Sequence, residues 1–272
     1  MLLSAIRLGR FRFGAAGKAT ALLSFALMAN LMPLATFAAM MPAIDRSWGL
    51  NASEAGWIGG IYFAGYAVSV PVLASATDRL DARWIFVGSS LPSAASSLAF
   101  ALADGFWTGL WLRFLSGAAL AGVQMPGLKL LADRTSGRAR ARGSAIYTSC
   151  YALGAAGSFL LAGVVEGFTG WRSTFIVSGI GPLLALAVVP LLPPVLAHSP
   201  AAAPRLDFRP IFRNRALMAY VVAFAGNTWE VFAVRVWFVA YLTWILGLPG
   251  NRLALPGAGG DLGIGFARRI SG

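Results

Sequence analysis

Ionisable side chains that interrupt long apolar stretches are the residues of this sequence best suited to chemistry. Arg113 lies about seven residues inside an apolar run, and Gly117, Ala121 and Gln124 follow it at helical spacing on the same face. A charge at that depth in a bilayer must face other helices or a water-filled cavity. Arg113 is therefore either a binding or proton-coupling group for a solute, or a structural arginine bonded to backbone carbonyls.

A second polar group lies in the last apolar run. Asn227 and Glu230 are three residues apart and share a helix face, whereas Arg235 lies about 140° further round the helix than Glu230. The two charges therefore cannot form a simple pair between residues four apart. Either the helix breaks, or each charge has a partner elsewhere.

Other polar and aromatic residues are candidates for lining a cavity, and each could equally be a hydrogen-bonded packing residue. The full set of substrate or coupling candidates is Asn30, Arg113, Gln124, Tyr147, Tyr151, Asn227, Glu230 and Arg235.

The composition identifies the class of protein that must position these residues. The chain has 272 residues, of which 58% are hydrophobic and only 12% charged, whereas a soluble domain carries about 25% charged residues. This predicts an integral membrane protein made only of helices. The net charge of +12 is then explained by basic cytoplasmic loops rather than by nucleic-acid binding.

Seven apolar runs are long enough to cross a bilayer as helices. They cover about 20–41, 55–76, 84–103, 106–128, 144–165, 172–192 and 216–246. The first run, after a basic N-terminus, also fits a signal peptide, but it is longer than a signal core of roughly 7–15 residues. We predict a basic N-terminus at 1–19, a six-span bundle at 20–192, a central linker at 193–215 and a seventh span at 216–246.

Two of these spans carry features that shape a helix. Pro33 cannot donate a hydrogen bond to Ala29, so the first helix should loosen there, beside Asn30. A loosened polar centre suits solute binding or is a packing kink. Gly56, Gly60 and Ala64 recur every four residues in the second span, and Gly117 lies in the fourth. These small residues predict close approach of a neighbouring helix.

The distribution of basic residues predicts the orientation of the chain. Fifteen Lys and Arg residues fall in the N-terminal segment, the second-to-third loop, the fourth-to-fifth loop and the linker, whereas the opposite loops hold only Arg46 and Arg172. The N-terminus and the linker are therefore predicted to be cytoplasmic. The expected location is a bacterial cytoplasmic (inner) membrane.

Chemistry of other kinds has no support in the sequence. The single histidine, His198, lies in the linker, and Cys150 has no histidine near it, so neither a metal cluster nor a nucleophile with a base is indicated. A glycine-rich loop for nucleotide phosphates is also missing. We therefore expect no enzyme activity, no metal and no cofactor.

Several motifs together resemble the major facilitator superfamily of secondary transporters. ASATDRLDARW, at 74–84, is similar to that family's G-x-x-x-D-R-x-G-R-R loop: Asp78, Arg79 and Arg83 match, while both glycines and one arginine are replaced. Arg113 followed by Gly117 resembles its fourth-span motif, and 170–175 its G-W-R-x-x-F phrase. The stretch 152–163 lacks the Gly-Pro step of the proton-antiporter branch, which disfavours drug–proton antiport.

The resemblance implies two six-helix halves around a central cavity that opens alternately to either side. It implies a conformational-switch loop at Asp78, Arg79 and Arg83, and a coupling or substrate role for Arg113. The expected partners are the lipid bilayer, a small organic solute and protons, with no nucleic acid.

The length of the chain leaves its activity open. The family needs about twelve spans, so the prediction is the N-terminal six-helix bundle plus a seventh helix, and the Gly-rich tail at 247–272 is either out-of-frame or a natural flexible tail. One hypothesis is a transporter of a small organic solute. The alternative is a truncated non-transporting protein, or a half-transporter that needs a homodimer partner or a missing second half.

The predicted orientation can be tested by cysteine labelling. In a Cys150→Ser background, Ser47→Cys should react with an impermeant maleimide on intact cells, because its loop carries little positive charge and should lie outside. Ser136→Cys, in the basic loop, should react only after the cells are permeabilised. Labelling in the reverse order would contradict the orientation.

Overall fold

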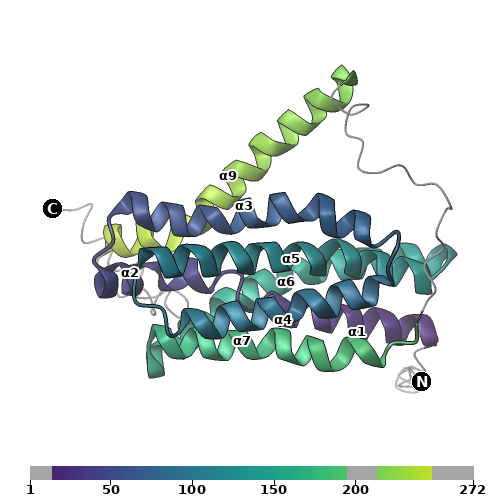
Figure 1. Ribbon diagram of the computed structural model, residues 1–272, viewed down its shortest axis with the longest axis horizontal. Helices are drawn as coiled ribbons and strands as arrows, with labels where there is room; N and C mark the ends of the chain where they lie inside the picture. The colour runs from purple at the N-terminus through teal and green to yellow at the C-terminus, as the bar shows by residue number, and fades with distance from the viewer. Residues whose placement is uncertain (1–13, 195–212, 247–272) are drawn as a thin grey trace, which may run out of the picture.

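The computed structural model describes residues 14–194 and 213–246, and every regular element in this part is helical. The predicted all-α fold is therefore confirmed (Figure 1). The elements are α1 (Ala15–Asn30), α2 (Thr36–Trp48), α3 (Ala52–Ala76), α4 (Ala82–Phe100), α5 (Phe106–Arg134), α6 (Gly137–Thr169), α7 (Trp171–Val188), the 3-10 turn η1 (Val189–Leu191) and α9 (Arg215–Leu246). The Gly-rich tail lies outside the described residues.

Five elements of the described part are long and apolar enough to cross a membrane: α3, α5, α6, α7 with η1, and α9. The predicted first span is divided into α1 and α2, and the predicted third span, α4, has only 19 residues and is rich in serine. Seven spans therefore remain a prediction, although a helix or pair of helices covers each predicted run.

The helices extend further than the apolar runs. The basic segment at 129–143, expected as a loop, is helical except at 135–136, because α5 continues to Arg134 and α6 starts at Gly137. Hydropathy marks the hydrocarbon core, whereas a helix can continue into water. The start of α3 is fixed by a capping box, in which Asn51 and Glu54 each accept a backbone hydrogen bond from the other.

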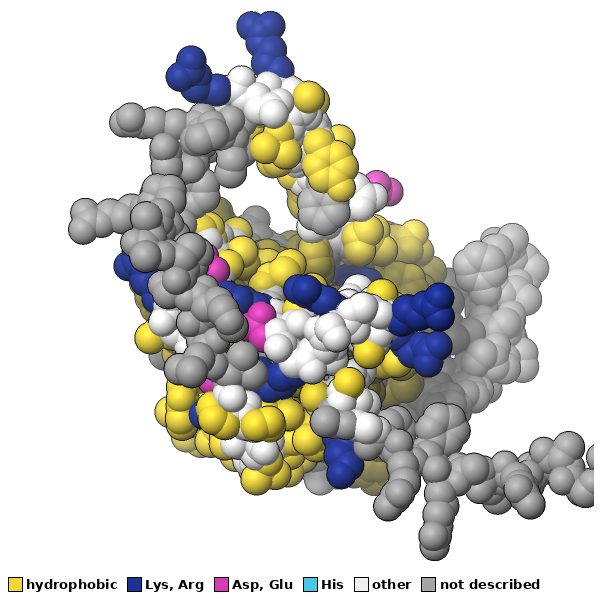
Figure 2. Space-filling view, turned by 90° about the vertical axis from the view of Figure 1, so that its right-hand side faces the viewer, with side chains coloured by type: hydrophobic (Ala, Val, Ile, Leu, Met, Phe, Trp, Pro, Cys, Tyr) yellow, Lys and Arg dark blue, Asp and Glu magenta, His cyan; other side chains and the backbone are white. Residues whose placement is uncertain are grey.

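Helices α1 and α2 follow one another end to end, and from this pair to α7 successive helices run side by side along one long axis and reverse direction at short turns (Figure 1). The α3–α4 and α5–α6 turns meet at the same end. Figure 2 looks onto this end, where Lys and Arg side chains gather. These two basic turns thus lie at one end, as the charge pattern requires of them.

The tightest helix contact lies between α3 and α5. Gly65 faces the backbone of Phe114, and Gly117 faces the carbonyl group of Tyr62, so closely that a Cβ atom at either glycine would overlap the opposite backbone. Small residues allow membrane helices to approach in this way. The predicted packing role of Gly117 is thereby given a specific partner helix.

The small-residue strip of α3 lies on another face. Gly60 and Ala64 are exposed, no described atom lies within 4 Å of a Cβ built at Gly60, and Gly56 meets only the Trp237 ring of α9. The strip lines a shallow groove between Ser53 and Ala64. Close packing along the whole strip is therefore not made by the described helices and stays a prediction.

Buried serines connect α4 to its neighbours. Ser96 and Ser116 share a hydrogen bond of 2.7 Å, and Ser97 donates to the Phe175 carbonyl at 2.9 Å. Such bonds act between membrane helices where the hydrophobic effect contributes little. They hold α5 and α7 against α4.

Helix α9 leaves the bundle at an angle and contacts it mainly through α2 (Figure 1). Phe232 packs on Phe63 with 4.2 Å between ring centroids, and Val236 lies against Gly59. One part of α9 therefore closes over the bundle near α2 and α3, and the rest stands away from it.

We predict that Gly117→Ala destabilises the chain, whereas Gly60→Ala does not. The added methyl group at position 117 must push α5 away from the Tyr62 carbonyl group, which should cost about 1–3 kcal/mol. The methyl group at position 60 meets no described atom. The melting temperature of each purified variant in detergent would measure the difference, and an equal melting temperature for both variants would contradict the α3–α5 contact.

Candidate functional site

The site is built around the interruption between α1 and α2. Residues 31–35 form turns rather than α-helix, which confirms the predicted loosening at Pro33. Met32 and Leu34 each donate to a carbonyl only three residues earlier, and Pro33 has no N–H to donate. The interruption leaves backbone groups without helical partners inside the bundle.

Side chains from the neighbouring helices satisfy these backbone groups. Ser158 of α6 donates to the Met32 carbonyl at 2.6 Å and accepts from the Ala35 N–H at 3.0 Å. Thr36 also donates to Met32, at 3.0 Å. Irregular backbone at membrane depth is stable only when protein groups or water supply such partners. Ser158 is thus a structural partner of the interrupted helix.

Arg113 approaches the same interruption from α5. Its side chain is buried, with the residue 4% exposed, and Nη1 donates to the Pro33 carbonyl at 3.5 Å. The guanidinium carbon lies 4.3 Å from the ring centroid of Tyr62 and 5.3 Å from that of Phe37. Its Nε has no hydrogen-bond partner among the described residues. The aromatic faces attract this cation, but most of its N–H donors have no acceptor among the described residues.

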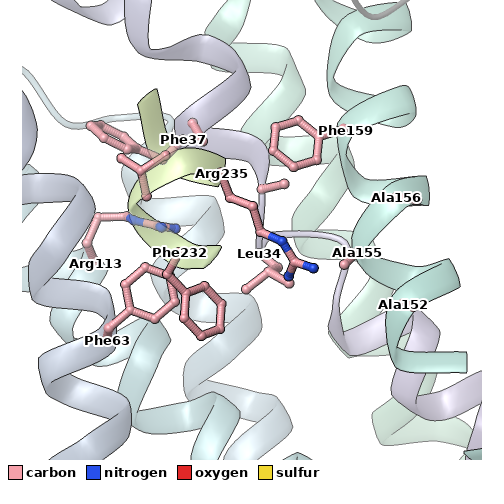
Figure 3. A pocket seen from close by; sticks show the side chains of 13 residues that line it. Leu34, Phe37, Phe63, Arg113, Ala152, Ala155, Ala156, Phe159, Phe232 and Arg235 are labelled. Carbon is pink, nitrogen blue, oxygen red and sulfur yellow. The ribbon is translucent and has the colours of Figure 1, made fainter. Parts of the chain in front are cut away.

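A cavity of about 220 Å³ lies beside Arg113, between α2, α3, α5, α6 and α9 (Figure 3). Its charged lining residues are Arg113 and Arg235, which enter it from α5 and α9. Phe37, Phe63 and Phe159 contribute to its apolar wall. A small concave site with a few polar groups in an apolar wall is the usual form of a ligand pocket.

The other predicted candidates from the bundle lie outside this lining. Asn30 donates to the Ala26 carbonyl at 3.2 Å and to Ser90 at 3.1 Å. Gln124 accepts from Tyr66 at 3.2 Å, and Tyr147 donates to the Val123 carbonyl at 3.3 Å. Tyr151 is half-buried against the core. Asn30, Gln124 and Tyr147 have the geometry of hydrogen-bonded packing residues, and a role in binding or coupling for any of the four stays a prediction.

The three candidates in α9 separate into two groups. Asn227 and Glu230 are exposed, and neither lines the cavity, whereas Arg235 does. The guanidinium carbon of Arg235 lies 5.7 Å from the ring centroid of Phe232. Glu230 and Arg235 do not pair with each other, as their spacing predicted. The two alternatives that followed from that spacing are not found in the described residues: α9 is unbroken from Arg215 to Leu246, and neither charge forms an ion pair elsewhere.

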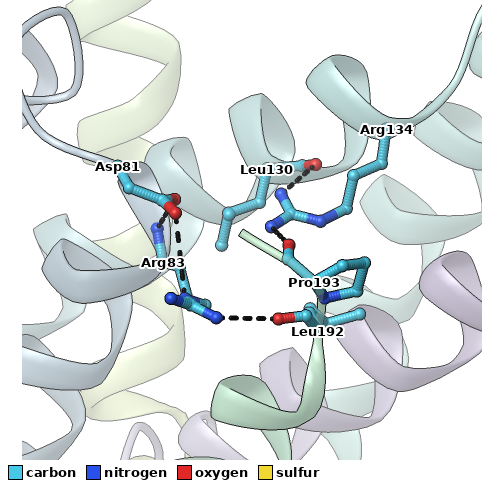
Figure 4. Close-up of polar contacts among 6 residues, drawn as sticks. All are labelled: Asp81, Arg83, Leu130, Arg134, Leu192 and Pro193. Carbon is cyan, nitrogen blue, oxygen red and sulfur yellow. Dashed lines mark hydrogen bonds and ion pairs between the residues drawn. The ribbon is translucent and has the colours of Figure 1, made fainter. Parts of the chain in front are cut away.

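The predicted switch loop connects three helices at the basic end. Asp78 accepts from Lys129 at 3.1 Å, which ties the loop to α5. Arg83 donates to the Leu192 carbonyl at 2.8 Å and has its Nε 3.8 Å from Asp81 (Figure 4). Arg79 is exposed.

Arg134 completes this connection, which the sequence did not suggest. It donates to the Pro193 carbonyl at 2.5 Å and to the Leu130 carbonyl at 3.1 Å. Two guanidinium groups, those of Arg83 and Arg134, therefore hold the chain where it leaves α7 and η1 (Figure 4). A conformational role for the loop itself stays a prediction.

Two elements of the site escaped the sequence. Phe63, Phe159 and Phe232 line the cavity, but aromatic residues in apolar runs carry no signal that separates them from lipid-facing ones. Ser158 was detectable in principle, as a polar residue in an apolar span.

Within residues 14–194 and 213–246, no group of three His, Cys, Asp or Glu residues could hold a metal ion.

The sequence model of the Major Facilitator Superfamily matches residues 23–272. Among similar proteins, the organic cation/carnitine transporter 4 of Arabidopsis thaliana is 30% identical over 56% of this chain, and the 4-hydroxybenzoate transporter PcaK of Pseudomonas putida is 32% identical over 56%. The aligned parts make up 29% and 34% of those proteins, so the chain spans only about a third of these relatives.

The fold is similar to a solved bacterial homologue of the human lysosomal transporter Spinster, crystallised in an inward-facing and unoccupied conformation. The TM-score is 0.76 at 16% sequence identity. The match covers 88% of this chain and 58% of that one. This likeness shows the fold alone.

We predict that Ser158→Ala lowers the free energy of unfolding by about 1–2 kcal/mol, because the buried Ala35 N–H loses its acceptor. Ser149→Ala, at an exposed position of the same helix, is the matched control and should have no effect. Denaturation with SDS in mixed micelles would give both values. Equal stability of the two variants would contradict a structural role for Ser158 at the interruption.

Proposed function

We propose that this chain, which belongs to the Major Facilitator Superfamily, takes part in moving a small organic solute across a membrane by alternating access. The family match over residues 23–272 supports a membrane transporter polypeptide rather than an enzyme. We further propose that the solute is a small organic molecule, that its transport is coupled to an ion, and that this 272-residue chain is active.

One observation supports a solute site in the cavity next to Arg113. A guanidinium group that is 4% exposed has a single long hydrogen bond, and its Nε has no partner among the described residues. Buried charges in membrane helices are costly and usually serve binding or transport. The interrupted helix beside it supplies the backbone carbonyl of Pro33, a feature that transporters use at binding sites.

The proposed cycle moves α9 against the bundle. The cavity lies between α9 and the helices α2, α3, α5 and α6, so movement of α9 would change access to it. The contacts of Arg83 and Arg134 at the basic end would then stabilise one arrangement, which gives the Asp78, Arg79 and Arg83 loop its proposed switch role. Proton coupling through Arg113 and orientation in an inner membrane are further parts of the proposal.

The relatives do not indicate one solute. Their names refer to carnitine and organic cations in one case and to 4-hydroxybenzoate in the other. Because the chain spans about a third of each, the proposed site would be shared with further helices, from a second half or from a second copy of this chain. The exposed strip at Gly56, Gly60 and Ala64 is the proposed contact for such a helix.

We predict solute accumulation by liposomes that contain the chain, and its loss in Arg113→Ala. The liposomes would be loaded with an unlabelled solute and tested for counterflow, using a panel of carboxylates, quaternary amines, nucleosides and sugars. Removal of the guanidinium should reduce uptake about tenfold or more, since charge-assisted hydrogen bonds are the strong ones. Arg113→Lys should retain part of the uptake.

Arg140→Ala is the matched control, because Arg140 is exposed near the start of α6. Melting temperatures of all variants would show whether lost uptake reflects unfolding. Unchanged uptake in Arg113→Ala at equal stability would remove Arg113 from the site. Failure of every solute class to exceed protein-free liposomes would contradict transport by this chain and support the non-transporting alternative.

A further inference from the structure

The lining of the cavity carries charge of one sign. Arg113 and Arg235 are its charged residues, and no described carboxylate lies within ion-pair distance of either. Arg113 is buried, and a buried charge without a counter-ion is strongly unfavourable, so a bound group of opposite sign would remove that cost. Arg235 is exposed and adds a second positive charge to the lining. The cavity therefore favours an anion over a neutral molecule or a cation.

The contacts of Arg113 leave room for such an anion. A guanidinium group has five N–H donors, whereas the structure gives Arg113 one hydrogen bond, of 3.5 Å, to Pro33. The rings of Phe37 and Tyr62 attract the positive charge of Arg113 through their faces. They do not accept hydrogen bonds from the N–H groups, which lie in the plane of the guanidinium. The free donors are those that a carboxylate binds with two parallel hydrogen bonds.

The second arginine comes from the opposite side of the site. Arg235 belongs to α9 and lines the same cavity as Arg113; Figure 3 shows the rings of Phe63 and Phe232 on the Arg113 side and the Arg235 guanidinium group near Leu34 and Ala155. Two cations from separate helices can hold one carboxylate between them.

The uncharged part of the cavity wall indicates the size and shape of the rest of the ligand. It is formed by Phe37, Phe63, Phe159 and Phe232 together with small alanines of α6, such as Ala155. The volume of about 220 Å³ is below the roughly 300–1,000 Å³ of drug-sized pockets. Flat rings stack well on aromatic walls, and a body of about one ring suits this volume.

We infer that the cavity selects a small aromatic carboxylate, held by Arg113 and Arg235 with its ring against the phenylalanine wall. This inference rests on the proposed function for its biological sense, since it names the class of solute. Binding, however, is a property of the cavity itself. It can be measured without transport.

Three nearly isosteric probes separate charge from shape. Benzoate is an anion, benzamide is neutral and benzamidine is a cation. Equilibrium dialysis of labelled benzoate with the purified 272-residue chain in detergent, in a gluconate buffer, should show binding. Unlabelled benzoate should compete at least about tenfold better than benzamide, because only the anion makes charge-assisted bonds with both arginines. Benzamidine should not compete.

Arg235→Gln should weaken benzoate binding by about tenfold or more for the same reason, while Arg138→Gln, which changes an exposed arginine of α6, should leave it unchanged. Arg235 is itself exposed on α9, so its replacement should not unfold the bundle, and Arg235→Lys should restore part of the affinity. Acetate, which lacks a ring, should compete poorly.

The outcomes are distinct from those of the transport experiment. Absence of binding by benzoate and phenylacetate at millimolar concentration would overturn the inference, as would equal competition by benzamide or full affinity in Arg235→Gln. Uptake of a neutral or cationic solute without benzoate binding would overturn it while transport stands. Benzoate binding without any uptake would support the inference and contradict transport by this chain.

Discussion

The interruption between α1 and α2 at Pro33 is the constraint on which the rest of the site depends. A proline there removes one helical hydrogen bond and leaves carbonyl groups without helical partners inside the bundle. Ser158 donates a hydrogen bond to the Met32 carbonyl and accepts one from the Ala35 N–H. Arg113 donates a hydrogen bond to the Pro33 carbonyl. Helices α5 and α6 are therefore held to the interruption by polar contacts, and the cavity forms where they meet.

Close packing elsewhere fixes the position of Arg113. Gly117 lies one helical turn after it and brings α5 against the backbone of Tyr62. This contact places the guanidinium carbon 4.3 Å from the Tyr62 ring centroid. A larger residue at 117 would move the charge away from both the ring and the Pro33 carbonyl. Gly117 thus affects the position of the Arg113 charge by allowing α5 to pack closely on α3. The same contact stabilises the fold and places the charge in the cavity.

The sequence predicts whatever depends on local rules. Apolar runs predict where the helices lie, and Pro33 predicts the interruption between α1 and α2. The position of Arg113 inside an apolar run predicts that its side chain points into the bundle. It does not predict which partner satisfies a buried polar group, because that partner is distant in the chain: Gln124 binds Tyr66, 58 residues away. The aromatic wall is not predicted for the same reason, since residues of four separate helices build it only after the bundle has folded.

A ligand that spans Arg113 and Arg235 would join the bundle to α9. Helix α9 contacts the bundle mainly through α2, so the two parts share few contacts that would hold one arrangement rigidly. An anion bound to both arginines would favour the arrangement in which the two charges are close, while the empty site would favour separation of two like charges. A ligand shifts a conformational equilibrium only through such a difference in affinity. The same pair of charges would therefore both select the solute and make the position of α9 depend on its presence, which is the link between binding and movement that alternating access requires.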